Sequence, residues 1–132
     1  MKKILSILVL FVGCLAAKAG DWILAYEDSQ FSVYFYDEIH ESYGKFGVWE
    51  KWVYKKAQVV RKKYYIEQKC YVEYDSDFTT RDVYEVLYYN KSHKLVESIS
   101  LDYPETMRVA PETVGADIAG AIYDWVYYDD ED

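Results

Sequence analysis

Few side chains in this sequence of 132 residues are suited to catalysis: two histidines, His40 and His93, and two cysteines, Cys14 and Cys70. A cysteine beside a histidine can act as a nucleophile when its thiol is exposed and its pKa is lowered. The sequence has no nucleophile elbow, no glycine-rich phosphate loop and no His-Glu-x-x-His zinc motif. These observations favour a protein that is not an enzyme and has no catalytic residues.

Two groups of side chains have donor atoms that suit a cation. The first is Glu38, His40 and Glu41, and the second is Asp75, Asp77 and Asp82. The first group would need a further ligand to complete a zinc site. The second surrounds two threonines, but it lacks the glycine and the terminal bidentate glutamate of an EF-hand loop. Solvated charged loops explain both groups, so we expect no metal and no other cofactor.

Any reactive group would have to be positioned by strands, because most of the chain alternates between apolar and polar residues. The expected strands are residues 22–27, 31–36, 46–54, 64–74, 82–89 and 94–102. Residues 37–45 are expected to form a loop and residues 55–63 a turn or hairpin connection. In the fourth segment Cys70 shares a face with Ile66 and Val72, and a shift by one residue would bury three charges. The pattern therefore favours a buried, structural Cys70, and a thiol that reacts or links two copies is the alternative.

Near the C-terminus the spacing of apolar residues changes from the alternation typical of strands. Apolar residues then recur at helical spacing, at Val114, Ile118, Ala121, Ile122, Trp125 and Val126. Pro111 suits the first turn of a helix, and Glu112 suits the positive end of its dipole. The expected fold is α+β: a single antiparallel sheet of about six strands with a C-terminal helix packed on it. One domain covers residues 20–128, followed by an acidic tail at 129–132.

The N-terminal 19 residues have the pattern of a signal peptide. Lys2 and Lys3 precede an apolar run, and small residues occupy positions 17 and 19. Cleavage between Ala19 and Gly20 would export the chain to the periplasm or the medium and would leave no membrane-spanning segment. The alternative is lipid attachment at Cys14 in Phe-Val-Gly-Cys, which would give an outer-membrane lipoprotein.

Residues 20–132 are strongly acidic and rich in tyrosine. The first 19 residues hold three lysines and no acid, so the total net charge of −8 becomes −11 for the remainder. That charge excludes nucleic acid as a favoured partner and predicts faster association with basic proteins. All 16 tyrosines also lie after residue 19. Tyrosine and tryptophan are common both in half-exposed sheets and at the centres of protein interfaces.

Two groups of residues are candidates for binding. The first is Tyr65 and Tyr71, which alternation places together on the polar face of segment 64–74. The second is a basic cluster that suits acidic polymers such as heparan sulfate: Lys55, Lys56, Arg61, Lys62 and Lys63. A solvated hairpin explains this cluster equally well.

The order of several short segments resembles the surface-adhesin protein E family, small exported proteins of Gram-negative bacteria. These segments are Trp22, Tyr36-Asp37, residues 48–51 with Tyr54, residues 67–70, Tyr88-Tyr89, residues 96–100 and residues 109–113. The resemblance implies an antiparallel sheet with a C-terminal helix, a tendency to dimerise, and adhesion to host matrix or serum proteins. Family members often carry a second cysteine in the final helix, paired with the one at Cys70. This sequence has Tyr123 and Trp125 in that helix and no cysteine.

The expected function is therefore that of an exported, non-enzymatic protein-binding module that mediates attachment to host matrix or serum proteins. The alternative is a periplasmic accessory or inhibitor that binds a basic enzyme, which the acidic charge supports equally well. Pairing of two copies through an exposed sheet edge is a further hypothesis, since unpaired strand edges are templates for strand addition.

Overall fold

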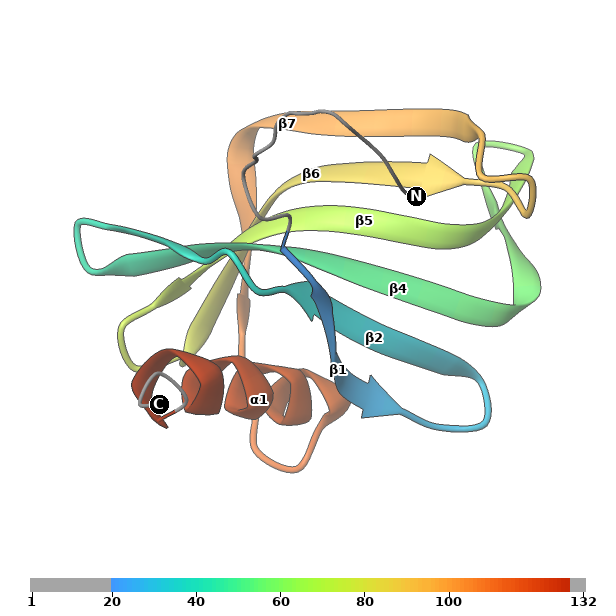
Figure 1. Ribbon diagram of the computed structural model, residues 1–132. Helices are drawn as coiled ribbons and strands as arrows, with labels where there is room; N and C mark the ends of the chain where they lie inside the picture. The colour runs from blue at the N-terminus through green and yellow to red at the C-terminus, as the bar shows by residue number, and fades with distance from the viewer. Residues whose placement is uncertain (1–19, 129–132) are drawn as a thin grey trace, which may run out of the picture.

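The alternating segments form one antiparallel sheet of seven strands, and a single helix packs on it (Figure 1). The computed structural model describes residues 20–128. The elements are β1 (Trp22–Glu27), β2 (Phe31–Tyr36), β3 (His40–Ser42), β4 (Lys45–Val60), β5 (Lys63–Asp75), β6 (Thr80–Tyr89), β7 (Leu95–Arg108) and α1 (Val114–Tyr128). The strands lie in the order β1-β2-β4-β5-β6-β7, with β3 paired to the start of β4. The expected α+β fold is confirmed.

The connections differ from those expected. Within residues 37–45, predicted to be a loop, β3 pairs with β4 through His40 and Gly47. Residues 55–60, predicted to lie in a connection, continue β4 instead. The turn to β5 needs only Arg61 and Lys62, whose φ angles are 47° and 68°. A two-residue turn with both φ values positive matches the twist of a hairpin, so the strands can continue up to the turn.

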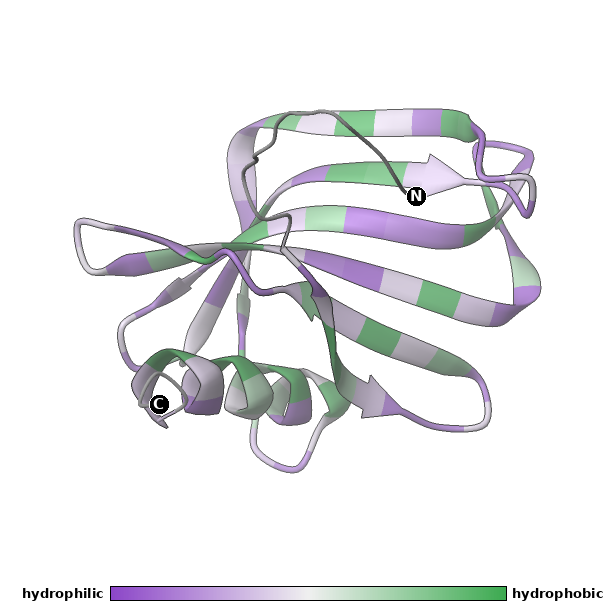
Figure 2. Cartoon of the chain, in the orientation of Figure 1, coloured by the Kyte–Doolittle hydropathy of each residue, from purple (hydrophilic) through white to green (hydrophobic). Residues whose placement is uncertain are grey.

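The core lies between α1 and one face of the sheet, which we call the inner face. It includes Val33, Phe35, Cys70 and Val72, all at most 3% exposed. Figure 2 shows the alternation of hydrophobic and hydrophilic residues along β2 and β4 that produces this face. The edge of the Phe35 ring contacts Trp125 of α1, with centroids 6.0 Å apart. Because Cys70 is buried on this face, the predicted inward orientation of its side chain is confirmed.

The helix begins later than Pro111. Glu112 has a φ of 60°, a left-handed conformation that cannot continue into a right-handed helix. Thr113 instead acts as the N-cap, because its Oγ1 accepts a hydrogen bond from the amide of Ala116 at 3.1 Å. The helix then runs from Val114. The expectation that Pro111 lies in its first turn is wrong.

The helix covers only part of the inner face. Trp125, Tyr127 and Tyr123 contact Phe35, Phe46 and Phe78 respectively. The ends of β4, β5, β6 and β7 that are distant from these contacts extend away from α1 (Figure 1).

The helix found within residues 20–128 lacks the length and hydrophobicity of a transmembrane span. The predicted signal peptide with Cys14 and Ala19, and the acidic tail at 129–132, lie outside the described residues.

Candidate functional site

The part of the inner face beyond α1 carries a continuous row of aromatic rings, which we call the aromatic row. It consists of five half-exposed residues: Phe31, Trp52, Tyr54, Tyr65 and Tyr88. Ring centroids are 5.3 Å apart for Phe31 and Trp52, and 5.7 Å apart for Phe31 and Tyr54. The row continues from Tyr54 to Tyr65 at 5.9 Å and from Tyr65 to Tyr88 at 4.8 Å. Four strands thus contribute to one aromatic surface.

Register shifts place Tyr65 in this row. Strand β4 pairs with β5 through Val53 and Glu67, and then only at Gln58 and Tyr65, so the alternation is interrupted between these pairs. Tyr65 consequently contacts rings on the face of Cys70. Tyr71 contacts Trp49 at 5.4 Å, and it lies on the opposite face, which we call the outer face. The prediction that Tyr65 and Tyr71 share a face is therefore wrong, because a bulge reverses the alternation.

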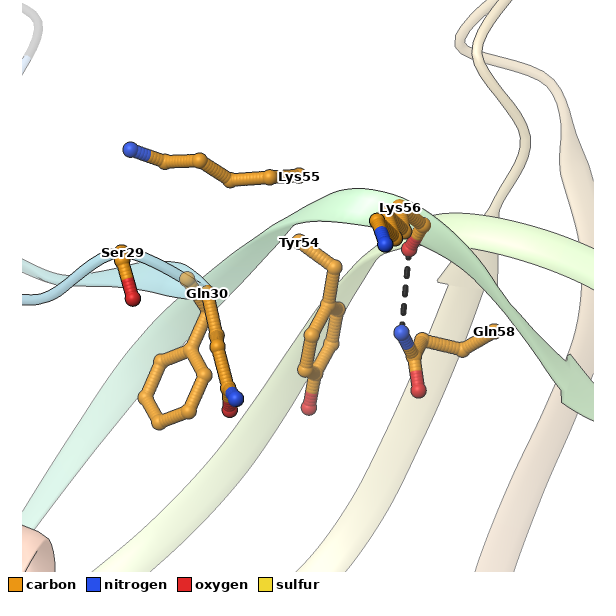
Figure 3. A pocket seen from close by; sticks show the side chains of 7 residues that line it. Ser29, Gln30, Tyr54, Lys55, Lys56 and Gln58 are labelled. Carbon is orange, nitrogen blue, oxygen red and sulfur yellow. Dashed lines mark hydrogen bonds between the residues drawn. The ribbon is translucent and has the colours of Figure 1, made fainter.

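A hollow of about 470 Å³ opens beside the row (Figure 3). Seven residues line it: Ser29, Gln30, Phe31, Tyr54, Lys55, Lys56 and Gln58. The side chains of Gln30, Tyr54 and Gln58 point to the same side of β4, whereas Lys55 extends to the other side (Figure 3). Gln58 donates a hydrogen bond from its Nε2 to the backbone oxygen of Lys56 at 3.0 Å. The hollow therefore combines apolar ring faces with amide groups at its margin.

A buried ion pair lies beneath the aromatic row. Glu50 is fully buried, and its Oε1 lies 2.5 Å from Nη2 of Arg81. The Tyr74 hydroxyl donates to the other carboxylate oxygen at 2.5 Å, and Trp52 Nε1 donates to Oε1 at 3.2 Å. Burial lowers the pKa of Arg81, but the negative charge of Glu50, its hydrogen bond and the neighbouring Tyr74 and Cys70 together outweigh this effect and raise that pKa above its ordinary value. The carboxylate is thus held by three donors, which suits a structural role.

Cys70 lies beside this ion pair and is not activated. Burial, together with the negative charge of Glu50, raises the pKa of its thiol to about 12. Gln68 Nε2 lies 3.6 Å from the sulfur. The thiolate is the nucleophile of cysteine chemistry, so a thiol with such a high pKa is unreactive at neutral pH.

At pH 8, we expect Cys70 to react with iodoacetamide at least about a hundredfold more slowly in the native protein than in the protein unfolded by urea. The reason is that each unit by which the pKa is raised lowers the thiolate fraction about tenfold. Mass spectrometry of the Cys70 peptide would measure the two rates and distinguish Cys70 from Cys14. Equal rates would show that the thiol is accessible and ionised.

The stability of the protein should fall in alkaline solution. The folded-state pKa of Cys70 is raised from 9.0 to about 12, and burial also raises the pKa of Tyr54, from 10.0 to about 12. Between pH 9 and 12 the unfolded chain releases protons that the folded chain retains. Stability from these groups is therefore complete below pH 9 and is lost as the pH rises towards 12. Urea unfolding at pH 8, 9 and 10 should show decreasing midpoints, and the decrease should be smaller in a Cys70→Ala variant.

The histidines do not approach Cys70. His40 lies on β3, and His93 lies in the turn between β6 and β7, at the other end of the sheet (Figure 1). Within the described residues, the structure brings no three His, Cys, Asp or Glu side chains together as a metal site. Asp75 instead closes its own turn, accepting hydrogen bonds from the amides of Thr79 and Thr80. Asp82 accepts a hydrogen bond from Thr106.

Two of the five residues of the predicted basic cluster are ion-paired with a carboxylate. Arg61 and Lys63 both contact the carboxylate of Glu97, at 2.9 and 3.0 Å. Hydrogen bonding to Lys63 lowers the pKa of Glu97, and Arg61 acts in the same direction. Lys55 and Lys56 lie at the hollow, while Lys62 occupies the hairpin turn. Two of the five charges are therefore paired with Glu97.

Of the aromatic row, only Tyr65 was predicted from the sequence to take part in binding. Trp52 and Tyr54 lie two residues apart on β4, and Phe31 is the register partner of Tyr54. Same-face spacing of aromatic residues in neighbouring strands was the sequence signal that could have identified the other four residues.

Comparison of the chain with protein-family models, with curated proteins and with solved structures finds no match.

Proposed function

We propose that this chain is an exported, non-enzymatic module that binds a protein partner through its aromatic row. The observation that supports this proposal is a row of five half-exposed rings beyond the contacts of α1. Half-exposed tyrosine and tryptophan provide large apolar area at low entropic cost, and such residues dominate binding energy in protein interfaces. The chemistry of Cys70 supports a role outside catalysis.

The partner class that we propose is a host matrix or serum protein, as the resemblance to the surface-adhesin protein E family implies. An extended or helical segment with apolar side chains would place them on the rings of the aromatic row. The amide groups of Gln30 and Gln58 at the hollow would then be available for hydrogen bonds with the backbone of the segment.

Surface plasmon resonance over immobilised laminin, collagen, fibronectin and serum albumin tests this proposal. We expect binding to at least one of them, and a loss of at least about tenfold in affinity for Tyr65→Ala, as for a central aromatic anchor. Tyr103→Ala is the matched control, because Tyr103 lies on β7 and is 85% exposed. Absence of binding to the whole panel, or an equal loss in both variants, would count against the proposal.

A second candidate function is inhibition of a basic enzyme in the periplasm. The net charge of −11 for residues 20–132 favours it, since opposite charge accelerates association. A turbidity assay with lysozyme and bacterial cells would detect slower lysis when the protein is present. Unchanged lysis at a molar excess of the protein would remove this candidate.

A further inference from the structure

The outer face carries two lysines in an arrangement that the fold does not require. Lys51 of β4 lies directly opposite Lys69 of β5 in the register. Like charges at directly opposite positions of an antiparallel pair are destabilising. Burial lowers the pKa of Lys51, the negative charge of Glu67 partly opposes this effect, and the positive charge of Lys69 acts in the same direction as burial. Glu67 offsets one of these two positive charges, and a bound anion would offset the other.

Aromatic rings surround the lysine pair. The Nζ of Lys51 lies 4.6 Å from the ring centroid of Trp22 and 5.2 Å from that of Tyr34. The Nζ of Lys69 lies 4.9 Å from the centroid of Tyr89 and 5.8 Å from that of Trp22. Cation–π contacts of this kind hold the ammonium groups at the surface of the sheet. Glu67 forms an ion pair with Lys69 at 3.9 Å, and because it is one acid beside two lysines, the three groups together keep a net positive charge.

A shallow hollow of about 260 Å³ lies beside Lys69, one member of the pair. Its lining is Trp22, Tyr36, Trp49, Lys69 and Leu87. The rings of Trp22 and Tyr36 meet at 61°, which leaves aromatic surface beside a cation. The carbon–hydrogen face of a sugar ring packs on such surfaces, and a carboxylate on the same ring would accept hydrogen bonds from a lysine ammonium group.

From this juxtaposition we propose that the outer face binds an acidic carbohydrate, with the carboxylate of a uronic acid between Lys51 and Lys69 and its ring against Trp22. The site is separate from the aromatic row, which lies on the inner face. A hollow of this size accommodates one sugar unit, so a polymer would bind along the sheet surface with one unit in the hollow.

The proposal can be tested by titrating the protein with a hexamer of galacturonic acid. Calorimetry and tryptophan fluorescence would each measure the binding. We expect a dissociation constant below ~1 mM. Lys51→Met and Lys69→Met should each weaken binding at least tenfold, as should Trp22→Ala. Lys55→Met removes the same charge from the margin of the other hollow, and its affinity should change less than twofold. Circular dichroism would confirm that each variant is folded.

Polyglutamate and a neutral galactose oligomer separate charge from sugar recognition. The proposal predicts that neither binds as tightly as the galacturonate hexamer. Equal binding of polyglutamate would show attraction to any carboxylate and would overturn the assignment to a sugar. Equal binding of the neutral oligomer would overturn the role of the lysines, as would unchanged affinity in both lysine variants. Absence of binding to the galacturonate hexamer would overturn the proposal outright, and none of these results bears on the inner face.

Discussion

Replacement of Glu50 by glutamine should destabilise the protein by about 3–5 kcal/mol, because it leaves the charge of Arg81 buried without its partner. Glu50 is fully buried and the Arg81 side chain is only 12% exposed. The amide would keep the shape of the carboxylate, so the effect would come from charge and hydrogen bonding. Urea unfolding followed by circular dichroism at pH 7 would measure it.

Two further variants isolate the cause. Glu105→Gln removes an exposed carboxylate from β7 and should change the free energy of unfolding by less than about 0.5 kcal/mol. The double variant Glu50→Met with Arg81→Met removes both charges, and it should recover part of the loss, since apolar replacement of a buried pair is often close to neutral. A double variant less stable than Glu50→Gln would contradict this explanation.

Phe35→Ala should cost about 3–5 kcal/mol, the range for removing a large side chain from a close-packed core. Phe35 is 1% exposed, and its ring meets Trp125 of α1. The resulting cavity would lie between the sheet and the helix, so one of the aromatic contacts that hold α1 on the sheet would be lost. The same unfolding measurement applies, with a shift in the tryptophan fluorescence of the folded protein, to which Trp125 contributes, as an additional readout.

Phe35→Leu and Leu24→Ala are the controls for this prediction. The first keeps most of the apolar volume and should cost less than half as much as alanine. Leu24 lies on the neighbouring strand β1 and is 51% exposed, so its truncation should cost about 1 kcal/mol or less. A cost for Leu24→Ala equal to that for Phe35→Ala would show that the loss does not come from burial of Phe35 in the core.

Local patterns predicted much of the fold. The expected bounds of the first two strands, residues 22–27 and 31–36, agree with β1 and β2. The alternation in segment 64–74 correctly oriented Cys70, because the side-chain period of a strand is a local property. Helical spacing likewise identified α1, although its first residue depended on the N-cap Thr113.

The candidate sites were less predictable. Tyr65 was assigned to the wrong face because a register shift in its strand pair is not visible in the alternation of one strand. Lys51 and Lys69 are 18 positions apart and unremarkable in sequence. Only the pairing of β4 with β5 places them opposite each other.

The sequence by itself determined the fold class, the inward orientation of Cys70 and the acidic charge of residues 20–132, because each follows from composition or from a local period. The tertiary structure alone decided which side chains meet. Glu50 and Arg81 are separated by 31 positions, and their contact depends on the pairing of three strands. The aromatic row likewise exists because four strands place one or two rings each on the same face, beyond the reach of α1. Strand register is set by packing across the whole sheet, and no short segment of the sequence specifies it.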